Sequence, residues 1–285
     1  MDEHEEHERS ELRAATAQPP AVEAERRVGV RIAPRDASPA ALAACVALAQ
    51  RAELLGLDWV AVAERFDARG GVPDALSLCA AFGAATERVR IATAALPLPL
   101  HHPLRVAEYA ATIDSLSAGR LELGVGLGAA ETPFGSFGLE ADERAERFAE
   151  ALSLLRAAWS DAPVTFRGKH FACDNVSVHP KPLQPGGPPL WLAAIAPAAQ
   201  RRAAQLGTGL MLPAEASASA YLDACAQAGT RARVVLLAAA GAERSAAEAA
   251  FACCAAARQA VWVLDVTSEA EVERAAAQAA ELRSA

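Results

Sequence analysis

Short apolar runs alternate with longer amphipathic stretches along most of the chain. Four of the runs precede residue 130, and four follow residue 188: VGVRIA, DWVAVAE, RVRIATAAL and RLELGVGL, then PLWLAAI, GLMLP, RARVVLLAAAG and AVWVLDV. Branched, apolar runs of this length predict buried strands, and the periodic stretches between them predict helices. The pattern therefore predicts eight strands and eight helices in strict alternation.

Strict alternation implies parallel strands joined by helical crossovers. The units fill residues 28–285, a length that fits a closed (β/α)8, TIM-like barrel of about 250 residues better than an open doubly wound sheet, which is the alternative. Helix starts support the assignment, because Ser38 is placed to cap a helix that opens at Pro39, and Pro103 opens another.

Two segments lie outside the alternation. Residues 163–189, PVTFRGKHFACDNVSVHPKPLQPGGPP, predict a β-hairpin excursion between the fourth and fifth strands, with its turn at Arg167–Gly168 and with His170 and His179 facing solvent. Residues 1–27 are polar, hold eight acidic and four basic residues, and show no apolar period. We therefore predict a disordered acidic tail at 1–27 and one barrel domain at 28–285.

Composition narrows the classes of function. The net charge is −8, and the chain contains no basic run of the kind that nucleic acid or an anionic membrane requires. No stretch is long and apolar enough to span a membrane, and the acidic N-terminus lacks the apolar core of a signal peptide, so we expect a cytoplasmic protein. Six cysteines without a CxxC spacing predict reduced packing residues, with neither disulfides nor a metal site.

In such a barrel, chemistry lies at the carboxyl ends of the strands. Glu64 and Arg65 follow the second strand and suit an acid or base beside an anion clamp, or a salt bridge on the rim. His101 and His102 precede Pro103 and suit a proton-transfer pair, or caps for the helix that begins there. The connections after strands three to six are mostly apolar, which favours a flat, largely apolar ligand.

The stretch LELGVGLGAAETPFGSFG, residues 121–138, is the richest in glycine. Gly124, Gly126 and Ala129 fill a G-x-G-x-x-A pattern, but these glycines do not open a helix, so a dinucleotide fingerprint is not favoured. Two interpretations remain: a backbone nest that binds phosphate, and a tight loop with a purely structural role.

The segments AERFD…GVGLG (63–128) and FGLEA…AAQLG (137–207) resemble the bacterial luciferase-like monooxygenase family, and the similarity covers roughly residues 28–213. The resemblance implies a TIM-like barrel, a dimer formed through the helices at 74–86 and 102–117, and reduced FMN or a deazaflavin coenzyme. It also implies oxidation or reduction of a small organic substrate. Glu64 matches a family glutamate, and Arg65 stands where the family often has a catalytic or ligand-orienting histidine.

The resemblance also assigns cofactor-binding residues. Thr93, Ala94 and Ala95 match the segment that carries a non-prolyl cis peptide under the flavin ring, and Gly126 and Gly128 match the family's glycine loop. The loop's usual phosphate-binding arginine is replaced by Leu127. A small polar pair after the fifth strand is replaced by Ile195–Ala196.

Two hypotheses follow from this mixture of kept and lost positions. In the first, the protein is a luciferase-like flavin-dependent oxidoreductase or monooxygenase that receives its flavin from a partner reductase or binds it in an altered pose. In the second, it is a non-catalytic relative that keeps the barrel and dimer surface and acts as a partner subunit or binding protein. The first predicts an accessible cleft beside Ala94–Ala95 with Arg65 pointing into it, and the second predicts that side chains such as Leu127 and Ile195 fill that cleft. We expect a homodimer, or a heterodimer with a related chain.

Overall fold

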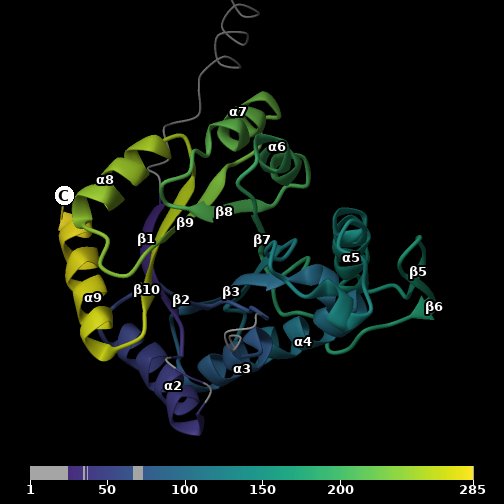
Figure 1. The fold of residues 1–285 in the computed structure, drawn as a ribbon, viewed down its shortest axis with the longest axis horizontal. Helices are drawn as coiled ribbons and strands as arrows, with labels where there is room; N and C mark the ends of the chain where they lie inside the picture. Colours follow the sequence, from purple (N-terminus) through teal and green to yellow (C-terminus); the bar gives the residue numbers. More distant parts are fainter. Residues whose placement is uncertain (1–24, 35, 37, 67–72, 285) are drawn as a thin grey trace, which may run out of the picture.

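Eight parallel strands close into a barrel with helices around it, so the predicted TIM-like fold is confirmed (Figure 1). A computed structural model describes residues 25–34, 36, 38–66 and 73–284. The barrel strands are β1 (Glu25–Ile32), β2 (Trp59–Val62), β3 (Arg90–Pro97), β4 (Leu121–Gly126), β7 (Leu190–Ala193), β8 (Gly209–Pro213), β9 (Arg233–Ala238) and β10 (Gln259–Val266). The helices are α2 (Pro39–Leu54), α3 (Ala75–Ala85), α4 (Pro103–Leu116), α5 (Arg144–Ala158), α6 (Pro197–Gln205), α7 (Ser219–Gln227), α8 (Arg244–Cys253) and α9 (Glu269–Ser284), with 3-10 turns η1 (Leu98–Leu100) and η2 (Phe134–Phe137).

The barrel closes where β1 pairs with β10. Glu25 pairs with Gln259 and the register continues to Ile32 beside Val266. Because pairing starts at Glu25, β1 begins three residues before the predicted barrel boundary at residue 28, and residues 25–27 are strand where the sequence predicted tail. The rest of the predicted tail, residues 1–24, lies outside the described residues.

The excursion after α5 is the predicted hairpin, formed by β5 (Val164–Arg167) and β6 (Ala172–Val176), and it lies beyond α5 in Figure 1. The carboxylate of Glu150 on α5 accepts the backbone N–H groups of Lys169, His170 and Phe171. This contact docks the turn on the helix. The expectation that His170 faces solvent is therefore wrong, since its side chain is only 6% exposed.

Small residues let the interior of the barrel pack around two tryptophans. Trp59 and Trp191 are fully buried there with Ala61, Ala92 and Met211. Gly29 faces Trp59, and a Cβ at Gly29 would lie 2.4 Å from the Trp59 carbonyl oxygen. The core fills the middle of the barrel and leaves polar side chains at its two ends.

Candidate functional site

The end of β3 forms a fixed platform at the mouth of the barrel. The peptide bond between Ala94 and Ala95 is cis, as the resemblance implied. Arg31 Nη1 donates to the Ala94 carbonyl oxygen (3.2 Å), and the Glu64 backbone N–H donates to the Ala95 carbonyl oxygen (3.4 Å). The hydroxyl of Thr93, which is fully buried, donates to the Gly124 carbonyl oxygen (2.7 Å) and ties the platform to β4.

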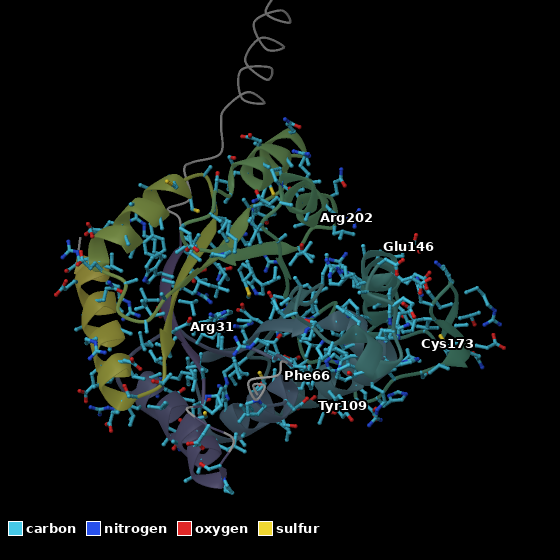
Figure 2. All side chains as sticks on the ribbon, in the orientation of Figure 1. Arg31, Phe66, Tyr109, Glu146, Cys173 and Arg202 are labelled. Carbon is cyan, nitrogen blue, oxygen red and sulfur yellow. The ribbon has the colours of Figure 1, made fainter. Side chains whose placement is uncertain are left out.

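Arg31 and Asp265 form a bidentate ion pair beside this platform. Arg31 Nε and Nη2 lie 2.6 and 2.8 Å from the two Asp265 carboxylate oxygens, and Figure 2 shows Arg31 inside the ring of strands. Paired N–H donors on a planar guanidinium fix the geometry of a carboxylate. From the sequence alone, Asp265 is only a polar residue at the end of the eighth apolar run, AVWVLDV. Arg31 was missed, although an arginine two residues after Gly29, on the inward face of a buried strand, is a usable signal.

Glu64 and His101 meet at the mouth from two different connections. The Glu64 side chain is fully buried, and its Oε1 lies 2.6 Å from His101 Nε2. Its Oε2 accepts the backbone N–H of Ala75 at the start of α3 (3.3 Å). The sequence indicated both residues separately but not their contact, because pairing across 37 positions depends on the closure of the barrel.

The other polar candidates near the mouth take different positions. His102 occupies the N-cap position of α4 but makes no side-chain cap hydrogen bond, so the capping interpretation is wrong for its imidazole. Burial and the nearby Arg147 guanidinium lower the pKa of His102. Arg65 is exposed on the rim next to buried Glu64. The sequence also places Arg35 after the first strand and Asp67 and Arg69 after the second, and these three lie outside the described residues.

The glycine loop adds a wall of small residues beside the platform, because Gly126 on β4 pairs with Pro97 at the end of β3. A Cβ at Gly126 would lie 3.3 Å from the Ala193 Cβ and 3.9 Å from the Ala95 Cβ, so a side chain at Gly126 would require its neighbours to move. Gly128 has a φ of +85°, which a residue with a side chain rarely adopts. The structure therefore gives a steric reason for Gly126 and a conformational reason for Gly128.

The loop offers backbone N–H groups where the resemblance implied a cation. Among the described residues, the N–H groups of Gly128, Ala129 and Ala130 have no hydrogen-bond partner. Leu127 packs partly buried against the core, and Ile195 is 62% exposed, so Ile195 does not fill the mouth. Helix α6 begins at Pro197 with no side-chain cap, which leaves first-turn N–H groups for an anion.

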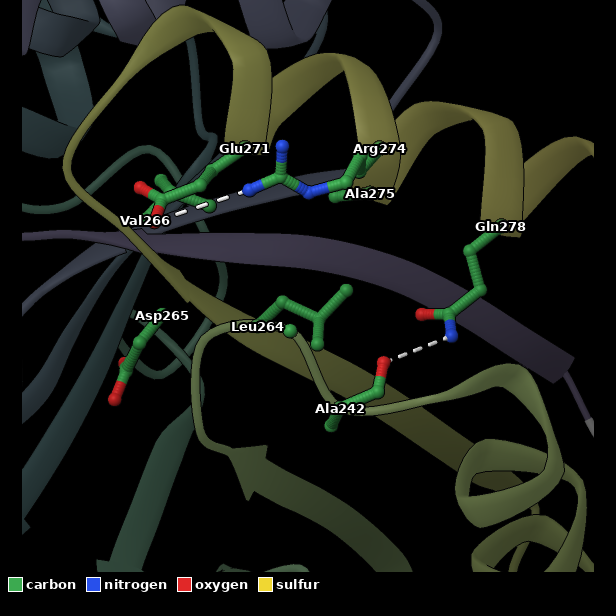
Figure 3. A pocket seen from close by; sticks show the side chains of 9 residues that line it. Ala242, Leu264, Asp265, Val266, Glu271, Arg274, Ala275 and Gln278 are labelled. Atoms are coloured by element: carbon green, nitrogen blue, oxygen red, sulfur yellow. Dashed lines mark hydrogen bonds and ion pairs between the residues drawn. The ribbon is translucent and has the colours of Figure 1, made fainter.

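A cavity lies on the outer side of β10, between the β9–α8 connection and α9. It has a volume of about 210 Å³ and includes Leu264, Glu271, Arg274 and Gln278 in its lining. Figure 3 shows Leu264 and Asp265 pointing to different sides of β10. Because the Asp265 carboxylate pairs with Arg31, it belongs to the mouth rather than to this outer cavity.

The described part of the chain holds no group of three or more His, Cys, Asp or Glu side chains suited to a metal ion. Among those same residues, no helix combines the length and apolar character needed to cross a membrane. All six cysteines are free thiols.

A closed parallel barrel with a cis-peptide platform and a glycine loop at its mouth defines a class of α/β-barrel proteins with a ligand site at the carboxyl ends of the strands. The sequence profile of the luciferase-like monooxygenase family matches residues 27–284, and the chain belongs to this family.

The F420-dependent glucose-6-phosphate dehydrogenase of Intrasporangium calvum is 34% identical over 183 residues, which cover 61% of this chain and 54% of that protein. The chain thus spans about half the length of the curated relatives it matches.

Solved structures agree on the fold. The monooxygenase RslO1 from Streptomyces bottropensis superposes with a TM-score of 0.77 at 24% identity, covering 90% of this chain and 98% of that one. The oxygenating constituent of 3,6-diketocamphane monooxygenase from Pseudomonas putida, in complex with FMN, has a TM-score of 0.62 at 19% identity and covers 75% and 66%.

Proposed function

We propose that this protein is an oxidoreductase that binds reduced FMN or the deazaflavin coenzyme F420 at the barrel mouth and acts on a small organic substrate. The observation that carries the proposal is the Ala94–Ala95 platform, which Arg31 and Glu64 hold by its two carbonyl oxygens and which lies beside the small-residue wall at Gly126. Family membership, the name of the Intrasporangium relative and the FMN in the Pseudomonas protein support this class of coenzyme.

The residues at the mouth fit such a coenzyme in two parts. Ala94, Ala95, Gly126 and Ala193 would hold the flat ring, since they expose no bulky side chain toward it. The N–H groups of residues 128–130 and the start of α6 would hold the phosphate, because successive backbone amides bind anions without a side-chain cation. Bound there, the reduced ring supplies a hydride or an electron pair.

We assign the Glu64–His101 pair to proton transfer. A carboxylate 2.6 Å from Nε2 favours the imidazole tautomer that carries its proton on Nε2, which leaves Nδ1 as the acceptor for a substrate proton. In this proposal His101 exchanges the proton and Glu64 positions it, a narrower role for Glu64 than the sequence suggested. Arg65, exposed beside the pair, is proposed to meet an anionic part of the ligand.

We also propose a dimer that uses α4. Tyr109 and Leu116, seven residues apart on one face of this helix, are 44% and 62% exposed. Light scattering after size-exclusion chromatography is expected to give twice the chain mass, and a monomer at every micromolar concentration contradicts this.

A flavin reductase as a further partner and a cytoplasmic location stay proposals. The six free thiols support the reducing compartment.

The competing proposal is the non-catalytic relative, which Leu127 and Ile195–Ala196 favour because they bring no charge to the phosphate. Equilibrium titration of the purified chain with FMN, reduced FMN and F420 separates the two. We expect at least one coenzyme to bind with micromolar affinity. Binding of none at high micromolar concentration would overturn the oxidoreductase proposal and leave the non-catalytic relative.

A further inference from the structure

The opposite end of the barrel, where the strands begin, holds a separate cavity of about 420 Å³. Five arginines line it: Arg27, Arg90, Arg231, Arg233 and Arg258. Two carboxylates, Glu25 and Glu122, oppose them, so the local formal charge is +3 in a chain whose net charge is −8. We call this cavity the barrel floor.

One of the two carboxylates is already fully engaged. Glu122 is buried, with 4% of its side chain exposed, and accepts the indole N–H groups of Trp59 (3.1 Å) and Trp191 (2.7 Å). Arg90 Nε donates to its other oxygen (2.8 Å). These donors neutralise and orient the Glu122 carboxylate, so it has little capacity to attract further cations.

The other carboxylate, Glu25, forms an ion pair with one arginine, Arg27. Glu25 Oε1 accepts from Nε and Nη2 of Arg27, at 2.9 and 2.6 Å. Among the described residues, Arg231, Arg233 and Arg258 have no ion-pair partner. Within the described part of the chain, the floor therefore carries three guanidinium groups whose charge no carboxylate matches.

Backbone hydrogen bonds connect the segments that carry these three arginines. The Arg258 backbone N–H donates to the Ala232 carbonyl oxygen, and the Glu25 N–H donates to the Arg258 carbonyl oxygen, both at 2.8 Å. Arg233 packs its guanidinium over the Trp191 ring, 4.9 Å from the ring centroid. Stacking of this kind restricts a long side chain and leaves its N–H edge free for an acceptor.

We propose that the barrel floor binds a small anion that carries two or more neighbouring oxyanion groups, such as a diphosphate or a tricarboxylate. Guanidinium forks pair with phosphate and carboxylate oxygens two at a time, and several converging arginines favour a multivalent anion over a monovalent one. The site lies at the amino ends of the strands, remote from Ala94–Ala95, so it does not depend on the proposed oxidoreductase function.

Trp191 gives the site a built-in reporter, because it contacts both Arg233 and Glu122. The test is a titration of the full chain with pyrophosphate, citrate and acetate at low ionic strength, followed by tryptophan fluorescence and by calorimetry. We expect pyrophosphate or citrate to bind with one-to-one stoichiometry and to change the fluorescence, and acetate to do neither. The stronger of the two ligands identifies the oxyanion chemistry.

Paired variants assign the binding to the floor. Arg231 and Arg258 are exposed, so R231Q/R258Q is expected to keep the fold and to weaken binding at least about tenfold, as expected for losing charge-assisted contacts. R201Q/R202Q removes the same charge from exposed positions on α6 and is expected to bind within twofold of the parent chain. Equal weakening in both double variants, an unchanged affinity in R231Q/R258Q, or equally tight acetate binding overturns the proposal.

Arg233→Lys adds a readout at the reporter itself, since lysine keeps the charge but loses the planar fork. We expect it to weaken binding and to reduce the fluorescence change, with far-UV circular dichroism unaltered. The parent affinity and full fluorescence change in this variant would contradict the role given to Arg233.

Discussion

Asp265 and Arg31 hold charge at a mouth whose other inward residues are mostly small and apolar. Their side chains are only 36% and 25% exposed, so water screens this pair less than a surface pair. Removing the carboxylate charge would leave a half-buried guanidinium that also supports the Ala94 carbonyl.

We therefore expect Asp265→Asn to lower the free energy of unfolding by about 1–2 kcal/mol. Glu248→Gln is the matched control, because Glu248 pairs with Arg244 on the exposed face of α8. This substitution should lower the free energy of unfolding by less than about 0.5 kcal/mol. Urea denaturation measures both variants. Equal losses of unfolding free energy in the two variants would show that water screens the Arg31–Asp265 pair as it does a surface pair.

Glu53, near the end of α2, joins that helix to the segment before β3. Its carboxylate accepts the backbone N–H groups of Glu87, Arg88 and Val89. Burial alone would raise the pKa of Glu53, but the N–H donors of Val89, Arg88 and Glu87 outweigh it, and the pKa lies below its ordinary value of 4.5. Because the folded-state pKa is depressed, this stabilisation is complete above pH 4.5 and is lost as the pH falls through the folded-state value.

Glu53→Gln is accordingly expected to destabilise the protein by about 1 kcal/mol at pH 7, since the amide keeps an acceptor oxygen but loses the charge. The stability difference from the parent chain should stay constant between pH 6 and 8 and shrink below about pH 4.5. Chemical denaturation across this pH range, with the exposed Glu140→Gln as control, measures it. A difference that grows on acidification contradicts the assigned role.

At the scale of the whole molecule, local pattern was enough to predict the architecture. Each strand has its own apolar run, and helix signals such as Ser38, whose hydroxyl accepts the Ala41 N–H, act within a few residues. The hairpin followed from the same kind of signal at Arg167–Gly168.

The contacts within the two polar ends could not be predicted in this way. Arg31 meets Asp265 across 234 positions and Glu64 meets His101 across 37, and the arginines of the barrel floor come from several strands. The sequence marks most of these residues as charged or polar, but only closure of the barrel brings them together. His170 shows the same limit, because its burial depends on Glu150 of α5.

The central claim is that the Ala94–Ala95 platform and the small-residue wall hold a flavin or deazaflavin ring. Its most direct measurement is the affinity of the best-binding coenzyme for Gly126→Val compared with Gly135→Ala. Valine adds two methyl groups beside a Cβ position that is already 3.3 Å from the Ala193 Cβ, whereas a Cβ at Gly135 meets nothing within 4 Å.

Gly126→Ala, which adds the Cβ alone, replaces the valine variant in the test if that variant unfolds. We expect Gly126→Val to lower the affinity at least about tenfold, and Gly126→Ala by less. We expect Gly135→Ala to bind like the parent chain. A folded Gly126→Val protein with the parent affinity, or an equal loss in Gly135→Ala, would contradict the account.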